Sequence, residues 1–213
     1  MRQSDPTAPK VGVGPHGLPW PADDRLDPEL LREGDRRNVI DRYRYWKLDA
    51  IVADLDQRRS PLHVAIQNWE HDFNIGSIVR TANAFNVSGV HIVGRRRWNR
   101  RGAMVTDRYL HVHHHADEEA LFAWLAEQQV VPVGVDNLPE SVPLEHASLP
   151  AACCLVFGSE GPGLTPKMVA GCQKLVAITQ PSCQERNGRS QLATGDLYRQ
   201  KVHQSRLAVL GFD

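Results

Sequence analysis

The sequence lacks any apolar run near the length that a membrane helix requires, which is about 20 residues. The stretch from Met1 to Asp24 also lacks the apolar centre of a secretory signal. We therefore expect a cytoplasmic protein with no membrane partner. Net charge is absent too, since 25 basic residues balance 25 acidic ones among the 213. The overall charge thus predicts no polyanionic partner.

Cysteine is scarce, and its spacing matches no common metal or redox motif. None of the four cysteines forms a C-x-x-C pair or a zinc-finger spacing. Cys153 and Cys154 stand in an apolar run, which predicts buried thiols and suits a reducing compartment. The nucleotide fingerprints are missing as well: there is no Gly-Lys-Ser/Thr and no G-x-G-x-x-G with an acidic residue about 20 positions later. This counts against a small-molecule enzyme that uses a dinucleotide or a nucleoside triphosphate.

Positive charge is nevertheless concentrated in one stretch, residues 95–108, which carries six arginines, one tryptophan and a single acid, Asp107. A basic cluster with an aromatic residue is typical of a path for nucleic-acid phosphates, although a solvated basic loop has the same composition. The residues that we predict to contact RNA are Arg95, Arg96, Arg97, Arg100 and Arg101.

Histidines are frequent just after this stretch, at His111 and at His113, His114 and His115. Adjacent histidines on a strand point to opposite faces, and no carboxylate or cysteine nearby has the spacing of a metal ligand. We therefore expect no metal.

The chain divides into four segments that differ in composition and in the spacing of apolar residues. Residues 1–26 are rich in Pro and Gly and predict a flexible leader, whereas 27–60 read as an N-terminal helical arm. Asp27 is a candidate N-cap there, with Pro28 at the first helical position. Residues 61–180 alternate between strand and helix patterns, and 181–213 form a tail with few apolar residues.

The alternation in 61–180 predicts an α/β fold with a mostly parallel sheet covered by helices. The expected strands are 63–66, 89–93, 130–135, 153–157 and 175–178, and the expected helices are 75–86, 117–128 and 165–172. In such sheets ligands bind where the strands end at their carboxyl sides. Two strand-to-helix loops have a suitable composition, "NWEHDFNIG" (68–76) and "GSEGPGL" (158–164).

The second loop is glycine-rich but contains Glu160, which would repel a phosphate. It better suits a ligand with positive charge, or a carboxylate that must accept hydrogen bonds from a neighbour. Its glycines could also simply provide a tight turn. Thr165 and Pro166, which follow it, predict an N-cap and the first residue of a helix.

The helix expected at 75–86 is amphipathic in an unusual way. Ile75, Ile78, Val79, Ala82 and Phe85 recur at helical spacing and predict a core face. Gly76, Arg80 and Asn83 fall together on another face. That face is either solvated or turned towards a site at the strand ends.

Two motifs in this order, "NIGSIVRTANAF" (74–85) and "LVFGSEGPGLTP" (155–166), resemble the first and second signatures of the SpoU-type (TrmH-like) branch of the SPOUT RNA methyltransferases. The resemblance covers residues 61 to 180. It implies a trefoil-knotted fold that binds S-adenosylmethionine in the knot, and a homodimer whose active site draws on both chains. It also implies methyl transfer to a ribose 2′-hydroxyl of tRNA or rRNA.

The resemblance assigns the catalytic centre to Asn74, Arg80 and Glu160, and the cofactor site to Val135, Asp136, Gly158, Ser159 and Ile178. Arginine is effectively always protonated in proteins, so Arg80 is a poor general base. Our hypothesis is that its guanidinium pairs with a backbone phosphate and orients the ribose, while Glu160 holds the guanidinium in place.

The resemblance stops after Gln180. A third motif and an apolar closing helix should follow, but the tail reads "PSCQERNGRSQLATGDLYRQKVHQSRLAVLGFD". Either a change of reading frame near codon 180 or a diverged tail would explain this. Two functions stay open as a result: an RNA ribose methyltransferase, or an RNA-binding protein of the same lineage that has lost catalysis.

Overall fold

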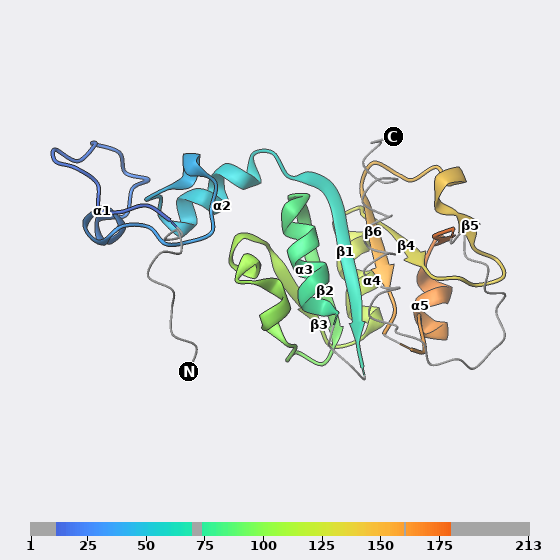
Figure 1. Ribbon diagram of the computed structural model, residues 1–213. Helices are drawn as coiled ribbons and strands as arrows, with labels where there is room; N and C mark the ends of the chain where they lie inside the picture. Colours follow the sequence, from blue (N-terminus) through green and yellow to red (C-terminus); the bar gives the residue numbers. More distant parts are fainter. Residues whose placement is uncertain (1–11, 70–73, 160, 180–213) are drawn as a thin grey trace. The chain divides into compact units, whose positions relative to one another are not determined.

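The computed structural model describes residues 12–69, 74–159 and 161–179 (Figure 1). These residues fall into two compact units, one ending at Gln57 and the other beginning at Arg58. Within the described ranges, no helix combines the length and the apolar character needed to cross a membrane. Residues 181–213, for which the sequence predicts a divergent tail, lie outside the described part of the chain.

The N-terminal unit contains three short helices in place of the long helical arm that we expected over 27–60. They are α1 (Pro28–Glu33), the 3-10 helix η1 (Asp41–Tyr43) and α2 (Leu48–Asp56). The predicted N-cap is confirmed, because the Asp27 side chain accepts from the backbone N–H of Glu29 and Leu30.

The arm is not continuous because the buried side chain of Asp35 binds backbone outside any helix. Its carboxylate accepts from the N–H groups of Arg37 and Tyr45 and forms an ion pair with the Arg37 guanidinium, Nη2 to Oδ2, at 2.7 Å. A short acidic side chain that captures local backbone N–H groups competes with helical hydrogen bonding. The α-helix therefore stops at Glu33 and resumes only at Leu48, with the short 3-10 helix η1 between them.

Residues 12–26, where we predicted a flexible leader, are part of this unit. Val13 forms a bridge with Asp35, and Leu26 forms one with Trp46. The backbone N–H of His16 also donates to the carbonyl of Leu31 at 2.8 Å. These backbone hydrogen bonds hold the segment against α1.

The second unit is built on a parallel sheet of seven strands, which confirms the predicted fold class. Neighbouring strands follow the order β3-β2-β1-β6-β4-β7-β5, and every pairing is parallel. The strands are β1 (Ser60–Asn68), β2 (Val87–Gly94), β3 (Val112–His115), β4 (Val131–Val135), β5 (Val142–Pro143), β6 (Cys153–Phe157) and β7 (Lys174–Ala177). All five expected strands are present. The two that the sequence did not predict, β3 and β5, are the short strands at the edges.

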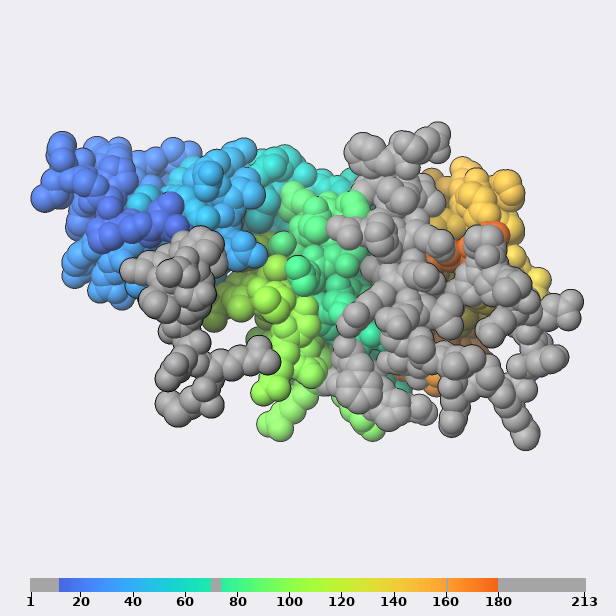
Figure 2. All heavy atoms as spheres, in the orientation of Figure 1, coloured from blue at the N-terminus to red at the C-terminus, as the bar shows by residue number. Residues whose placement is uncertain are grey.

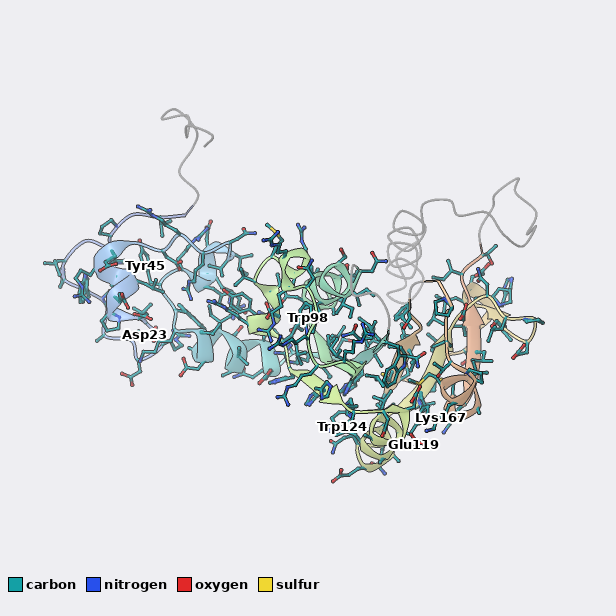
Figure 3. The ribbon with its side chains drawn as sticks, turned by 90° about the horizontal axis from the view of Figure 1, so that it is seen from below. Asp23, Tyr45, Trp98, Glu119, Trp124 and Lys167 are labelled. Carbon is teal, nitrogen blue, oxygen red and sulfur yellow. The ribbon has the colours of Figure 1, made fainter. Side chains whose placement is uncertain are left out.

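Helices cover both faces of this sheet, as the alternating pattern predicts. The three are α3 (Ile75–Ala84), α4 (Glu118–Glu127) and α5 (Pro166–Gly171). The apolar residues of α3 pack with Val64, Ile66 and Ile92 on one face, whereas α4 and α5 pack with Ala65, Val93 and Val156 on the other. Figure 3 shows α4 and α5 side by side, joined by the ion pair of Glu119 and Lys167.

A cluster of four histidines lies between the sheet and α4. His63 of β1, His91 of β2, and His113 and His115 of β3 gather around the ring of Trp124. Nε2 of His91 lies 3.1 Å from Nδ1 of His63, and its Nδ1 lies 2.9 Å from Nε2 of His115. His114 points the other way and contacts the Gly94 carbonyl, as alternation on a strand requires.

The cluster keeps its imidazoles neutral. Burial, followed by the nearby His113, lowers the pKa of His63 from 6.5 to about 4, and the same causes lower the pKa of His91 to about 2. Burial also lowers the pKa values of His113 and His115. No group of His, Cys, Asp or Glu among the described residues is arranged to hold a metal ion.

We predict that acid destabilises the protein through this cluster. Below pH 6.5 the imidazoles of His63 and His91 become protonated in the unfolded chain but stay neutral in the folded protein. The free energy of unfolding should therefore fall as the pH drops from 6.5 to about 4. Each such histidine contributes about 1.4 kcal/mol per pH unit. Urea denaturation at several pH values would measure this slope.

The matched variants are His91→Gln, which removes a buried titrating ring, and His111→Gln, which changes an exposed one. The first should flatten the pH dependence by about 1.4 kcal/mol per pH unit, and the second should leave it unchanged. Equal slopes in all three proteins would contradict the role of the cluster.

Candidate functional site

The five residues predicted to bind the cofactor lie at the carboxyl ends of three adjacent strands. Val135 ends β4, and it pairs with Phe157 of β6 on one side and Val176 of β7 on the other. Asp136 follows β4, Gly158 and Ser159 follow β6, and Ile178 follows β7. Residues from three distant parts of the sequence therefore share one edge of the sheet, where parallel sheets bind ligands.

The loop after β6, residues 158–164, folds back on itself at this edge. Ser159 and Gly163 form a bridge, with the Gly163 N–H donating to the Ser159 carbonyl at 3.1 Å. A Cβ on Gly158 would lie 2.0 Å from the carbonyl carbon of Gly163, so no other residue fits there.

Asp136 connects this loop to β4. Its Oδ2 accepts from the backbone N–H of Leu164 at 2.8 Å, and its Oδ1 accepts from that of Asn137. A Cβ on Gly163, which has a φ of +78°, would lie 2.3 Å from the same Oδ2. Gly163, which a tight turn could explain, is thus also needed for close contact with a carboxylate.

A buried polar network fixes the base of the loop and the start of α5. The side-chain amide of Gln67 donates to Glu118 and to the Thr165 hydroxyl, each at 3.0 Å, and its carbonyl accepts from the Thr165 N–H. The Thr165 hydroxyl in turn donates to Glu118 at 2.9 Å and accepts from the N–H of Met168. The predicted N-cap role of Thr165 is confirmed.

The network continues into the loop through Ser159, which is buried. Its hydroxyl donates to the backbone carbonyl of Gln67 at 3.2 Å. β1, α4, α5 and the loop are therefore held by one set of hydrogen bonds. Gln67 and Glu118 carry no motif that sequence reasoning could recognise, since an isolated polar residue at a strand end or a helix start is usually solvated.

Helix α3 presents Arg80 to solvent from the opposite face of the sheet. As predicted, Ile75, Ile78, Val79 and Ala82 are buried, and Phe85 packs at the edge of the same cluster. Asn74 is the N-cap residue of α3, although its side chain makes no capping hydrogen bond. α3 ends two residues before the predicted end because Asn86 adopts a left-handed conformation with φ of 48°.

The arginine loop, residues 95–108, docks on the first turn of α3. It contains the 3-10 helices η2 (Arg100–Ala103) and η3 (Thr106–Tyr109), and both contact α3. The two backbones meet at glycines: a Cβ on Gly76 would lie 2.8 Å from the Gly102 Cα. Figure 1 shows this light-green segment beside α3.

The start of the loop is held by Asn68, the last residue of β1. Its side-chain amide donates to the carbonyls of Arg95 and Arg97 at 2.7 and 3.0 Å. The five arginines predicted to bind RNA all have exposed side chains: Arg95, Arg96, Arg97, Arg100 and Arg101. Arg100 forms an ion pair with Asp107 at 3.5 Å and lies over the Trp98 ring.

The structure thus collects the predicted residues into two groups. The cofactor residues share the ends of β4, β6 and β7, while Asn74, Arg80 and the arginine loop lie around α3 on the neighbouring strands β1 and β2. β1 and β6 are paired, with Ile66 opposite Phe157, so the groups lie on adjacent strands of one sheet. Glu160, the third predicted catalytic residue, lies outside the described residues.

Comparison with known proteins decides the family. The sequence model of the SpoU rRNA Methylase family matches residues 61–185, more than half of the chain. The chain belongs to this family. An uncharacterized tRNA/rRNA methyltransferase of Mycobacterium leprae is 28% identical over 185 residues, which make up 84% of this chain and 59% of that protein.

Solved structures agree with the fold. The SpoU methyltransferase AviRb from Streptomyces viridochromogenes matches with a TM-score of 0.58 and 19% identity, over 75% of this chain and 64% of AviRb. The TrmH/SpoU tRNA modifying enzyme of A. aeolicus matches with a TM-score of 0.55 and 20% identity, over 78% of this chain and 84% of that enzyme. AviRb has also been solved in complex with AdoMet. The chain spans about three fifths of the M. leprae relative and of AviRb.

We predict that Gly163→Ala prevents the loop from adopting the conformation that binds AdoMet, whereas Gly161→Ala does not. Both glycines have positive φ, so alanine costs about 1–2 kcal/mol of backbone strain at either position. Only at Gly163 would the new methyl group collide with the Asp136 carboxylate, since nothing lies within 4 Å of a Cβ on Gly161. Calorimetric titration of AdoMet should show at least a tenfold larger loss of affinity for Gly163→Ala. Equal losses would contradict the contact between the loop and Asp136.

Proposed function

We propose that this protein is an RNA 2′-O-ribose methyltransferase that uses S-adenosylmethionine and acts on tRNA or rRNA. The observation that carries the proposal is the shared edge of β4, β6 and β7. It gathers Val135, Asp136, Gly158, Ser159 and Ile178 next to the strands that support Arg80 and the arginine loop. Membership of the SpoU family supports the same reading.

The residues at this edge suit a cofactor with a positively charged sulfonium. The described parts of segments 134–138, 158–164 and 176–179 contain no lysine or arginine, and Asp136 provides a carboxylate. Val135, Leu164 and Ile178 add apolar surface against which a base could pack. The residues that would hold the cofactor are thus a carboxylate, apolar walls and the backbone of a glycine-rich turn. When bound, the cofactor supplies the methyl group that the ribose oxygen attacks.

Arg80 is assigned the positioning of the RNA. Its side chain is exposed on α3, one helical turn after the glycine on which the arginine loop docks. A guanidinium stays protonated and offers two parallel N–H donors to a phosphate, so it can fix the backbone beside the reacting hydroxyl. Holding reactants in the correct geometry can supply much of the rate enhancement. Asn74 begins the same helix and is assigned a polar contact in the same centre, and Glu160 is proposed to hold the guanidinium.

We also propose that the protein is a cytoplasmic homodimer with a knotted C-terminal region. The described cysteines Cys153, Cys154 and Cys172 are free, which suits a reducing compartment. The dimer and the knot follow from the family, in which the active site draws on both chains. Light scattering after size exclusion would test the dimer.

The function is tested by incubating the full chain with labelled S-adenosylmethionine and unmodified tRNA or rRNA. Label in RNA, at a nucleotide that resists alkaline cleavage because its 2′-oxygen is blocked, would support the proposal. Salt-dependent RNA binding without cofactor binding would instead support the alternative of an RNA-binding protein that has lost catalysis. The basis of this alternative is the missing third motif.

We predict that Arg80→Lys lowers methyl transfer about 100-fold, because lysine keeps the charge but loses the fork that orients the phosphate. The affinity for S-adenosylmethionine should not change, since Arg80 does not belong to the cofactor edge. Single-turnover transfer rates and calorimetry would measure the two effects. Arg32→Lys, in the N-terminal unit, is the matched control. Near-full turnover of Arg80→Lys with normal RNA binding would refute the assigned role.

A further inference from the structure

The arginine loop carries an exposed apolar tip that the RNA-binding arginines do not explain. Met104 and Val105 lie between η2 and η3, and their side chains are 64% and 54% exposed. They are the most exposed large apolar side chains among the described residues of the second unit. Figure 2 shows the light-green loop at the molecular surface.

The backbone of this tip is strained. Met104 has a φ of 50° and Val105 a φ of 68°, so two successive residues with side chains adopt the left-handed conformation. For a β-branched residue such as valine this is a real outlier, because the left-handed conformation brings Cβ too close to the following carbonyl oxygen. Strain of this kind persists only where the surroundings impose it, and it is concentrated at functional sites.

The residues on both sides of the tip are held by contacts with the rest of the unit. Ala103, just before the tip, is fully buried, and the neighbouring Gly102 contacts the backbone of α3 at Gly76. After the tip, the Thr106 hydroxyl donates to the Ala103 carbonyl at 2.6 Å. The tip is therefore presented on a fixed base instead of being free to relax and cover its apolar side chains.

The charge around the tip indicates its ligand. Arg101 on one side and Arg108 on the other have exposed side chains. Two apolar side chains are far too few for a protein interface, which buries about 800 Å² on each partner. A small apolar projection with arginines on both sides fits a nucleic acid instead. The arginines can contact phosphates, and proteins insert apolar side chains such as Met between base steps. In RNA, the bases available for such contact are those of single-stranded regions.

We propose that Met104 and Val105 form a wedge that packs against unstacked bases of a single-stranded RNA region, while the flanking arginines hold its phosphates. This inference rests on the proposed function and adds to it the class of RNA structure that the site selects. The wedge lies on the loop that docks on α3. It would therefore keep the target nucleotide out of its stack near Arg80.

The experiment measures binding of the full chain to a single-stranded RNA of about 16 nucleotides and to the duplex of the same sequence. A central 2-aminopurine reports base unstacking by its fluorescence. The double variant Met104→Ser/Val105→Ser should bind the single strand about tenfold more weakly and lose the fluorescence increase. Its affinity for the duplex and the slope of log K against log salt should stay as in the wild type, because no phosphate contact is removed.

Two controls separate the wedge from other effects. Val142→Ser changes an exposed valine on β5, at the opposite edge of the sheet from β3, and should have no effect. Arg101→Gln should weaken binding to both RNAs and reduce the single-strand salt slope by about 0.7. An equal loss for single strand and duplex would overturn the wedge, as would a change of oligomeric state in the double variant, which would indicate a protein contact. If the wild type shows no salt-dependent RNA binding, the proposed function fails together with the wedge.

Discussion

The hydrogen-bond network of Gln67, Glu118 and Thr165 is the interaction on which the arrangement of the second unit depends. It lies where β1 ends, where α4 begins and where the loop after β6 turns into α5. Every polar atom that it buries has a partner, and a satisfied network of this kind specifies one arrangement. Ser159 extends it into the glycine-rich loop, so hydrogen bonds connect this loop to β1, α4 and α5.

On the other face of the sheet, close contact between glycines has the same organising effect. The approach of Gly102 to Gly76 brings the arginine loop onto the helix that carries Arg80. Asn68 fixes the start of the loop, and it follows Gln67 directly in β1. Two consecutive residues at one strand end therefore organise the two faces: Gln67 the side with the cofactor loop, and Asn68 the side with the cationic surface.

This division agrees with the methyl transfer proposed above, a reaction between two different ligands. One group of residues is carboxylate, apolar and glycine-rich, and the other is cationic with an apolar tip. The two groups lie on adjacent strands of one sheet.

Local patterns in the chain were enough to locate most elements and to indicate the family. Periodicity located five of the seven strands and the helices α3, α4 and α5, because each has its own apolar pattern and turn residues. It missed β3, whose run of histidines looks polar although the ladder with His91 and Trp124 buries half of it. It also predicted helix across residues 34–47, where the buried Asp35 carboxylate binds the backbone instead. Motif order alone indicated Arg80 and Gly158, since those residues carry the family signature.

Which residues contact one another could be learned only from the folded chain. The register of β4 with β6 and β7 places Asp136 beside Gly163, and the docking of the arginine loop exposes Met104 and Val105. Such contacts join positions far apart in the chain or depend on backbone angles that side-chain types do not reveal. The spacing of apolar residues within a segment indicates which face of that segment is buried. Which polar groups are left to pair, and across which strands, depends on the packing of the whole sheet.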